Sequence, residues 1–198
     1  TPLSPEYMAT VRDLSDKYGL KIHLDGARIF NAAVALKVPV LKLTEKVDSV
    51  MFCLSKGLSA PVGSLVCGSS EFIDKARKMR KMVGGGMRQA GHLAAAGLIA
   101  LQELIERLQE DHENAKILAS GLSRLDGIEI DEIQIKTNII FFKMTGIDGE
   151  TFIDQLEKKH IKLLMTGAGI FRAVLHREVS KEQVETVIES INSILAKR

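Results

Sequence analysis

The chain has 198 residues, of which 45% are hydrophobic, and this is enough for one domain with a substantial core or for a larger domain with a small lobe. Its 27 basic and 25 acidic residues leave a net charge of +2, so global charge points neither to nucleic acid nor to a membrane, and we expect no partner of either kind. The apolar run at residues 93–101 is too short to span a bilayer, and the opening residues lack a basic-then-apolar secretory pattern. A cytoplasmic location is expected, with a mitochondrial one left open.

The first 127 residues alternate helical and strand-like patterns, as in a large α/β domain. Ser4 followed by Pro5 is typical of a helix start, and Gly19 ends the helix that it predicts. The first half of the predicted helix at 88–110 is apolar nearly all round, which indicates burial. The expected elements in chain order are helix 5–18, strand 20–25, helix 27–36, strands 47–54 and 61–67, and helices 69–82, 88–110 and 112–125.

From residue 128 the rhythm changes to that of a second, smaller α/β lobe. The patterns predict strand 137–144, helix 149–159, strands near 161–165 and 170–175, and a last helix from 181. Ser180 and Gln183 form a capping box at the start of that helix. We therefore expect two domains, residues 1–127 as part of a large α/β domain and residues 128–198 as a small C-terminal one.

Two ionisable residues stand at the ends of short apolar strands, each directly before a glycine. Lys56 lies in the run FCLSKGLSAPVGS (52–64), and Asp25 lies in HLDGAR (23–28). An amine and a carboxylate so placed are what pyridoxal phosphate chemistry needs, because the lysine forms a Schiff base with the cofactor aldehyde and the acid keeps the pyridine nitrogen protonated. The alternatives are a surface lysine in a turn and an aspartate that caps the following helix.

Three arginines are candidates for binding anionic groups. Arg28 follows Asp25 by three residues, so its guanidinium can hold a carboxylate or a phenolate-type oxygen, unless it is a surface arginine. Arg88 follows the glycines at 84–86 before a predicted helix, and the two together favour a phosphate site, although glycine triplets are common in loops. Arg172, in a predicted strand of the small lobe, could bind the α-carboxylate of an amino acid.

Four segments together carry a family resemblance. Residues 23–31 (HLDGARIFN), 55–64 (SKGLSAPVGS), 81–92 (KMVGGGMRQAGH) and 171–179 (FRAVLHREV) closely resemble the low-specificity L-threonine aldolases, which are fold-type I pyridoxal phosphate enzymes. The resemblance covers essentially the whole chain. It implies pyridoxal phosphate as cofactor, cleavage of the small-molecule substrates L-threonine or L-allo-threonine to glycine and acetaldehyde, and homodimers or homotetramers with active sites at the dimer interface.

The resemblance also implies a role for each candidate residue. Lys56 matches the Schiff-base lysine, and Asp25 matches the acid at the pyridine nitrogen. Arg28 and Arg172 match arginines that engage the substrate carboxylate, and Arg88 matches an arginine close to the cofactor, here assigned to its phosphate. The expected site, which includes no metal ion, consists of Lys56, Asp25, Arg28, Arg88, Ser55 and Arg172.

One departure from the family lies ahead of Thr1. Family members carry a substantial N-terminal segment there, with a Gly-Thr phosphate loop and a histidine that stacks on the cofactor ring, and neither occurs in this sequence. The chain is thus expected to resemble the C-terminal part of such an enzyme, with an exposed sheet edge and poor solubility. Two alternatives stay open, a catalytically dead polypeptide that acts only through its dimer surfaces, and another fold-type I lyase or transaminase.

Overall fold

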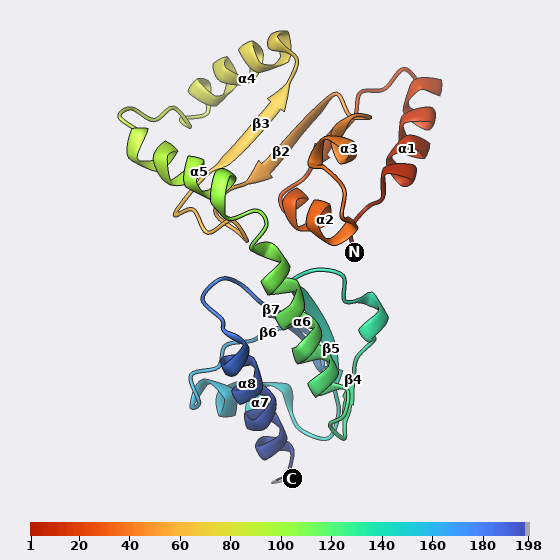
Figure 1. The fold of residues 1–198 in the computed structure, drawn as a ribbon, viewed down its shortest axis with the longest axis vertical. Helices are drawn as coiled ribbons and strands as arrows, with labels where there is room; N and C mark the ends of the chain where they lie inside the picture. The colour runs from red at the N-terminus through yellow and green to blue at the C-terminus, as the bar shows by residue number, and fades with distance from the viewer. Residues whose placement is uncertain (197–198) are drawn as a thin grey trace. The chain divides into compact units, whose positions relative to one another are not determined.

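The computed structural model describes residues 1–196, and the chain separates into two compact units, Pro2–Leu108 and Gln109–Arg198 (Figure 1). The sequence places a domain boundary after residue 127, and this stays a prediction about the domains of the family fold. The helix before that boundary belongs to the C-terminal unit in the structure, because its buried residues Leu118 and Leu122 pack into the core of that unit.

The N-terminal unit contains a three-stranded sheet with the order β1-β2-β3. β1 and β2 run parallel, whereas β3 is antiparallel to β2. The strands are β1 (His23–Asp25), β2 (Ser49–Cys53) and β3 (Ser64–Gly68). The helices are α1 (Pro5–Lys17), α2 (Ile29–Leu36), α3 (Val40–Thr44), α4 (Ser70–Met82) and α5 (Gly91–Glu103). Because β1 and β2 are parallel, their carboxyl ends lie at the same edge of the sheet.

The core of this unit forms where α2 and α3 cover one face of the sheet. Ile29 and Ala33 of α2 are buried together with Leu43 of α3 and Val50 of β2. A second buried cluster gathers around the turn that follows β2 and consists of Leu54, Leu58, Ala60, Ala100 and Leu108. The segment after β2 is therefore held by apolar contacts on both sides of its exposed tip.

Strand β3, which forms one side of this three-stranded sheet, is not covered by other elements of the described part of the chain. All five residues of β3 are exposed, and α4 buries none of its side chains. The prediction that the apolar first half of the next helix is buried is wrong, since Leu98 and Ile99 of α5 are 57% and 51% exposed. Cys67 of β3 is a free cysteine and is exposed. Among residues 1–196, no element covers the apolar side chains of this surface.

The C-terminal unit is built on an antiparallel sheet with the order β4-β5-β7-β6. Its strands are β4 (Ile128–Glu129), β5 (Ile139–Met144), β6 (Leu164–Gly167) and β7 (Ile170–Val174). Its helices are α6 (Leu108–Leu122), the short 3-10 helix η1 (Glu132–Gln134), α7 (Gly149–Glu157) and α8 (Lys181–Leu195). Figure 1 shows α6, α7 and α8 on one face of this sheet.

Alternation along the strands divides this sheet into a buried and an open face. Phe142 and Phe171 pair across β5 and β7, and their rings stack with centroids 5.5 Å apart, while Phe152 of α7 meets Phe171 edge-to-face. Phe141 and Arg172, which form the next cross-strand pair, point to the opposite face. No helix among residues 1–196 is long and apolar enough to cross a membrane.

Candidate functional site

The parallel pairing of β1 and β2 brings the two strand ends singled out in the sequence to one edge of the sheet. Asp25 is the last residue of β1 and lies opposite Met51 in the register of the two strands. β2 continues to Cys53, and Lys56 follows in the turn directly after it. Ligands of α/β sheets bind at the carboxyl ends of parallel strands, so this edge is the candidate site.

Backbone hydrogen bonds join the segment after β1 to the end of β2. The Gly26 amide donates to the Met51 carbonyl at 2.9 Å, and the Cys53 amide donates to the Ala27 carbonyl at 3.3 Å. A methyl group at Gly26 would lie 2.9 Å from the Met51 oxygen, so this close approach requires glycine. The positions of Asp25 and of the turn after β2 are therefore coupled through the backbone.

Asp25 does not cap the following helix. Its side chain is exposed, and Oδ1 accepts a hydrogen bond from the amide of Ala27 at 3.1 Å in a local turn. The N-cap of α2 is instead Arg28, which makes no side-chain cap bond. Arg28 is half-buried and lies just before the helix rather than one turn inside it. The capping alternative for Asp25 is thus wrong.

Lys56 is the exposed tip of an anchored turn. The Leu54 amide donates to Gly63 at 2.9 Å, and the Ala60 amide donates to Leu54 at 3.0 Å, which closes the loop around the lysine. The flanking residues Gly57 and Leu58 are buried, whereas Lys56 and its neighbour Ser55 are exposed. The turn therefore presents an amine to solvent from a fixed backbone.

Asn31 is a residue of this region that the sequence analysis did not single out. It lies in α2, is 3% exposed, and its side-chain amide packs on Gly57, the residue after the lysine. A signal was present, because Asn31 is the one polar residue in the apolar helix IFNAAVAL. A buried amide in such a helix indicates a specific hydrogen-bonding role.

The other end of the same strands is occupied by structural contacts. His23 Nδ1 lies 2.8 Å from the hydroxyl oxygen of Ser49. Asp48 accepts hydrogen bonds from Lys21, from the Ile22 amide and from Arg12 of α1. These donors, Lys21 foremost, hold the pKa of the Asp48 carboxyl well below its usual range.

The two remaining arginines lie elsewhere in the chain. Arg88 is exposed in a bend ahead of α5, and that helix begins only at Gly91, so Arg88 is not in its first turn. Arg172 is half-buried on the open face of the C-terminal sheet, between the exposed side chains of Phe141 and Leu164 on the neighbouring strands. The roles of both arginines stay predictions.

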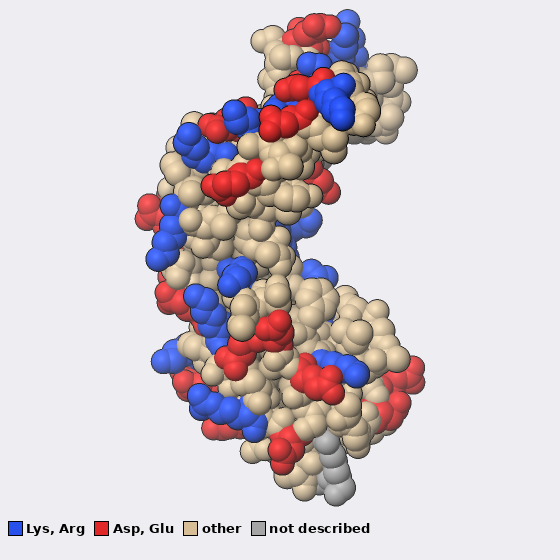
Figure 2. Space-filling view, turned by 90° about the vertical axis from the view of Figure 1, so that its right-hand side faces the viewer, with Lys and Arg blue, Asp and Glu red and all other residues tan. Residues whose placement is uncertain are grey.

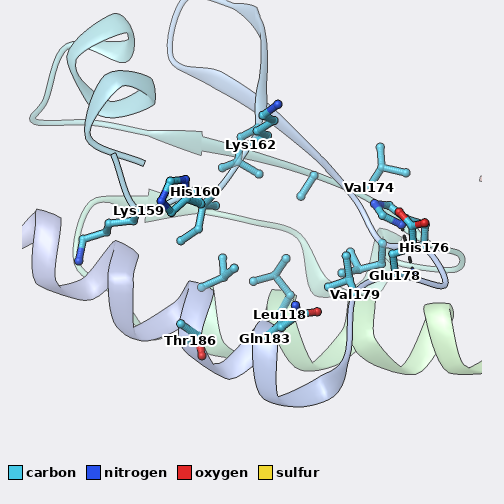
Figure 3. Close-up of a pocket in the computed structure, with 15 residues that line it drawn as sticks. Leu118, Lys159, His160, Lys162, Val174, His176, Glu178, Val179, Gln183 and Thr186 are labelled. Atoms are coloured by element: carbon cyan, nitrogen blue, oxygen red, sulfur yellow. Dashed lines mark hydrogen bonds between the residues drawn. The ribbon is translucent and has the colours of Figure 1, made fainter. Parts of the chain in front are cut away.

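A separate cavity of about 470 Å³ lies within the C-terminal unit (Figure 3). Its lining includes apolar side chains such as Leu118 and Val179, together with His160, Lys162 and His176. None of the six predicted site residues lines this cavity. On the face shown in Figure 2, basic and acidic side chains are interspersed without a large field of one sign. Among residues 1–196, no group of three or more His, Cys, Asp or Glu could hold a metal ion.

Comparison with known proteins gives both a family match and close relatives. The family described as beta-eliminating lyase matches residues 1–145. A protein of Arabidopsis thaliana named low-specificity L-threonine aldolase 1 is 46% identical over 185 residues, which make up 92% of this chain and 52% of the relative. The chain spans about half the length of the curated relatives it matches. The resemblance to the low-specificity threonine aldolases seen in the sequence is confirmed.

Solved structures support the same fold. A structure of Leishmania major threonine aldolase superposes with a TM-score of 0.77 at 18% identity and covers 98% of this chain and 57% of that one. A structure titled Oryza sativa TDC with PLP and tryptamine gives a TM-score of 0.74 at 18% identity, and covers 96% of this chain and 45% of that one. These matches confirm the predicted fold class, part of a fold-type I α/β large domain followed by a small α/β domain.

Proposed function

Because the chain belongs to the beta-eliminating lyase family, we propose that it carries the lysine side of a pyridoxal phosphate site in an enzyme of the threonine aldolase type. The reaction would cleave L-threonine or L-allo-threonine to glycine and acetaldehyde, in an oligomer of such chains. The observation that carries this proposal is the shared edge of β1 and β2, at which the anchored turn of Lys56 follows one strand and Asp25 ends the other. Relatives named threonine aldolase support the choice of substrate class.

The residues at this edge fit the cofactor. Lys56 would hold the aldehyde carbon through its amino group, and the turn that carries it is closed by backbone bonds and flanked by buried leucines. Asp25 would hold the ring nitrogen in its protonated form, since a neighbouring carboxylate favours a cation. When bound, the cofactor supplies the electron sink for cleavage at the α-carbon.

Further residues would bind the substrate and the anionic parts of the cofactor. Arg28 lies in the same backbone-coupled segment as Asp25, and its guanidinium can form two parallel hydrogen bonds with a carboxylate. Ser55 directly precedes Lys56 and exposes its hydroxyl at the same turn. Arg88 and Arg172 are proposed for the phosphate and for the substrate carboxylate on the family resemblance alone.

A second candidate is a non-catalytic polypeptide that acts through its surfaces. The fully exposed strand β3 favours it, because an uncovered strand can pair with another chain. The two candidates differ in chemistry, because only the first requires a reactive amine at Lys56.

The test is to incubate the chain with pyridoxal phosphate, reduce the mixture with borohydride, and locate the pyridoxyl mark by peptide mass spectrometry. The proposal predicts a dominant mark on Lys56, which is lost in Lys56→Ala and kept in Lys46→Ala, a matched exposed lysine of the same unit. Marks spread evenly over the surface lysines would contradict the proposal. Release of glycine and acetaldehyde from L-threonine then distinguishes the aldolase from the non-catalytic candidate.

A further inference from the structure

We infer that Asn31 is a positioning residue that fixes the Lys56 turn against helix α2, an inference that rests on the function proposed above. Lys56 itself is exposed, and among residues 1–196 its side chain has no hydrogen bond or ion pair that would orient it. Its position must therefore come from the backbone of the turn that carries it. Asn31 is a buried polar side chain from another element, helix α2, that packs directly on that backbone.

Both the oxygen and the nitrogen of the Asn31 amide lie close to Gly57. A methyl group at Gly57 would lie 3.0 Å from Asn31 Oδ1 and 3.6 Å from Nδ2, and also 3.0 Å from Leu108. The amide of Asn31 thus occupies the space in which a side chain at residue 57 would lie. This explains why a glycine follows the lysine even though its backbone dihedral φ is not positive.

The chemistry of Asn31 differs from that of its surroundings. The hydrophobic cluster at the turn consists of Leu54, Leu58, Ala60, Ala100 and Leu108, and Asn31 lies next to Leu108 of this cluster at Gly57. A leucine would fill a similar volume among these side chains without any polar atom to satisfy. An amide is directional, since its oxygen accepts and its nitrogen donates hydrogen bonds along fixed axes. An amide at this place can therefore orient the turn in a way that an apolar side chain of the same size cannot.

The same helix also reaches the other half of the site. α2 begins directly after the segment that contains Asp25 and Arg28, and the Ala27 carbonyl accepts from the Cys53 amide just before the Lys56 turn. The two strand ends are thus joined by the Gly26–Met51 and Cys53–Ala27 backbone bonds, and the Lys56 turn is additionally held by Asn31 on Gly57. Loss of the Asn31 contact removes the support closest to Lys56 and lets the turn shift relative to Asp25, and small displacements of this kind are costly for reacting groups.

The test measures the rate and the pH profile of pyridoxyl incorporation at Lys56 in Asn31→Leu, Asn31→Asp and wild type. Asn31→Leu keeps the volume and removes the amide, whereas Asn31→Asp keeps an oxygen of the same shape. We expect Asn31→Leu to lower the rate at Lys56 at least about tenfold. Asn31→Asp keeps Oδ1 but replaces the Nδ2 donor with an acceptor, so we expect it to restore only part of the rate. Asn138→Leu is the matched control, because Asn138 is also buried and donates to the Leu175 carbonyl at 2.7 Å in the other unit.

The outcomes separate this inference from the proposed function. Wild-type rates in Asn31→Leu, with a loss of melting temperature like that of Asn138→Leu, would show a merely structural role and overturn the inference. A wild type without preferential marking of Lys56 would instead overturn the proposed function and the inference together. If Asn31→Leu does not fold, Gly57→Ala approaches the same contact from the other side and is expected to slow incorporation at Lys56. A wild-type rate in folded Gly57→Ala would then overturn the inference.

Discussion

Gly26 is the residue at which backbone geometry and the candidate site are most directly linked. In Gly26→Ala the new methyl would lie 2.9 Å from the Met51 carbonyl oxygen, and 3.2 Å from both Ile29 and Val50. The oxygen belongs to the backbone of β2, so it cannot rotate away as a flexible side chain would. Overpacking of this kind costs about 1–3 kcal/mol. The weakened hydrogen bond from the Gly26 amide adds about 1 kcal/mol, for a total of about 2–4 kcal/mol.

The assay for this prediction is urea unfolding followed by tyrosine fluorescence. The chain contains two tyrosines and no tryptophan, and Tyr7 and Tyr18 both lie in or next to α1, so the signal reports on the N-terminal unit. Gly91→Ala is the control, because a methyl there meets no atom within 4 Å. Because Gly91 is the first residue of α5, alanine there is expected to change the stability by less than the roughly 0.5–1 kcal/mol typical of a glycine in the middle of a helix. A Gly26→Ala protein as stable as Gly91→Ala would refute the steric argument.

Three further predictions concern charge and exposure. Lys21 and the other donors lower the folded-state pKa of Asp48, so the ionised carboxylate stabilises the fold fully above about pH 4 and loses this effect as the pH falls further. Asp48→Asn should therefore be less stable than wild type in urea titrations at pH 6, and the difference should shrink in acid. Burial lowers the pKa of His112, so the unfolded chain binds the proton first, and the melting temperature should fall as the pH drops below about 6.5 in wild type but less in His112→Gln. Val66 is 44% exposed on β3, and Val66→Lys should reduce the aggregation measured by light scattering. Equal aggregation in Val66→Lys and Val66→Ile would contradict a role of this exposed strand in aggregation.

Local signals in the sequence predicted local structure well. Ser4 accepts from the Tyr7 amide at the start of α1, and both bonds of the capping box between Ser180 and Gln183 are present in α8. Such caps depend on residues three apart, so no distant partner is needed to find them. The strand ends at Asp25 and near Lys56 were likewise visible, because each short apolar run stops at a glycine turn.

Features that depend on distant partners could not be found this way. The predicted helix 88–110 is interrupted, with α5 ending at Glu103 and α6 beginning at Leu108, because Leu108 packs with Leu54 and Leu58 from the turn after β2. Composition predicted a buried helix at α5 but could not show that its neighbours leave it exposed. The contact of Asn31 with Gly57 joins positions that only the fold brings together.

The most direct test of the whole account is a crystal structure of the chain after reduction with borohydride in the presence of pyridoxal phosphate. The account predicts one pyridoxyl group on Lys56, with its ring nitrogen within hydrogen-bonding distance of the Asp25 carboxylate. A ring attached to Lys56 whose nitrogen faces away from Asp25, or a ring attached to another lysine, would contradict the claim that these two strand ends form one site.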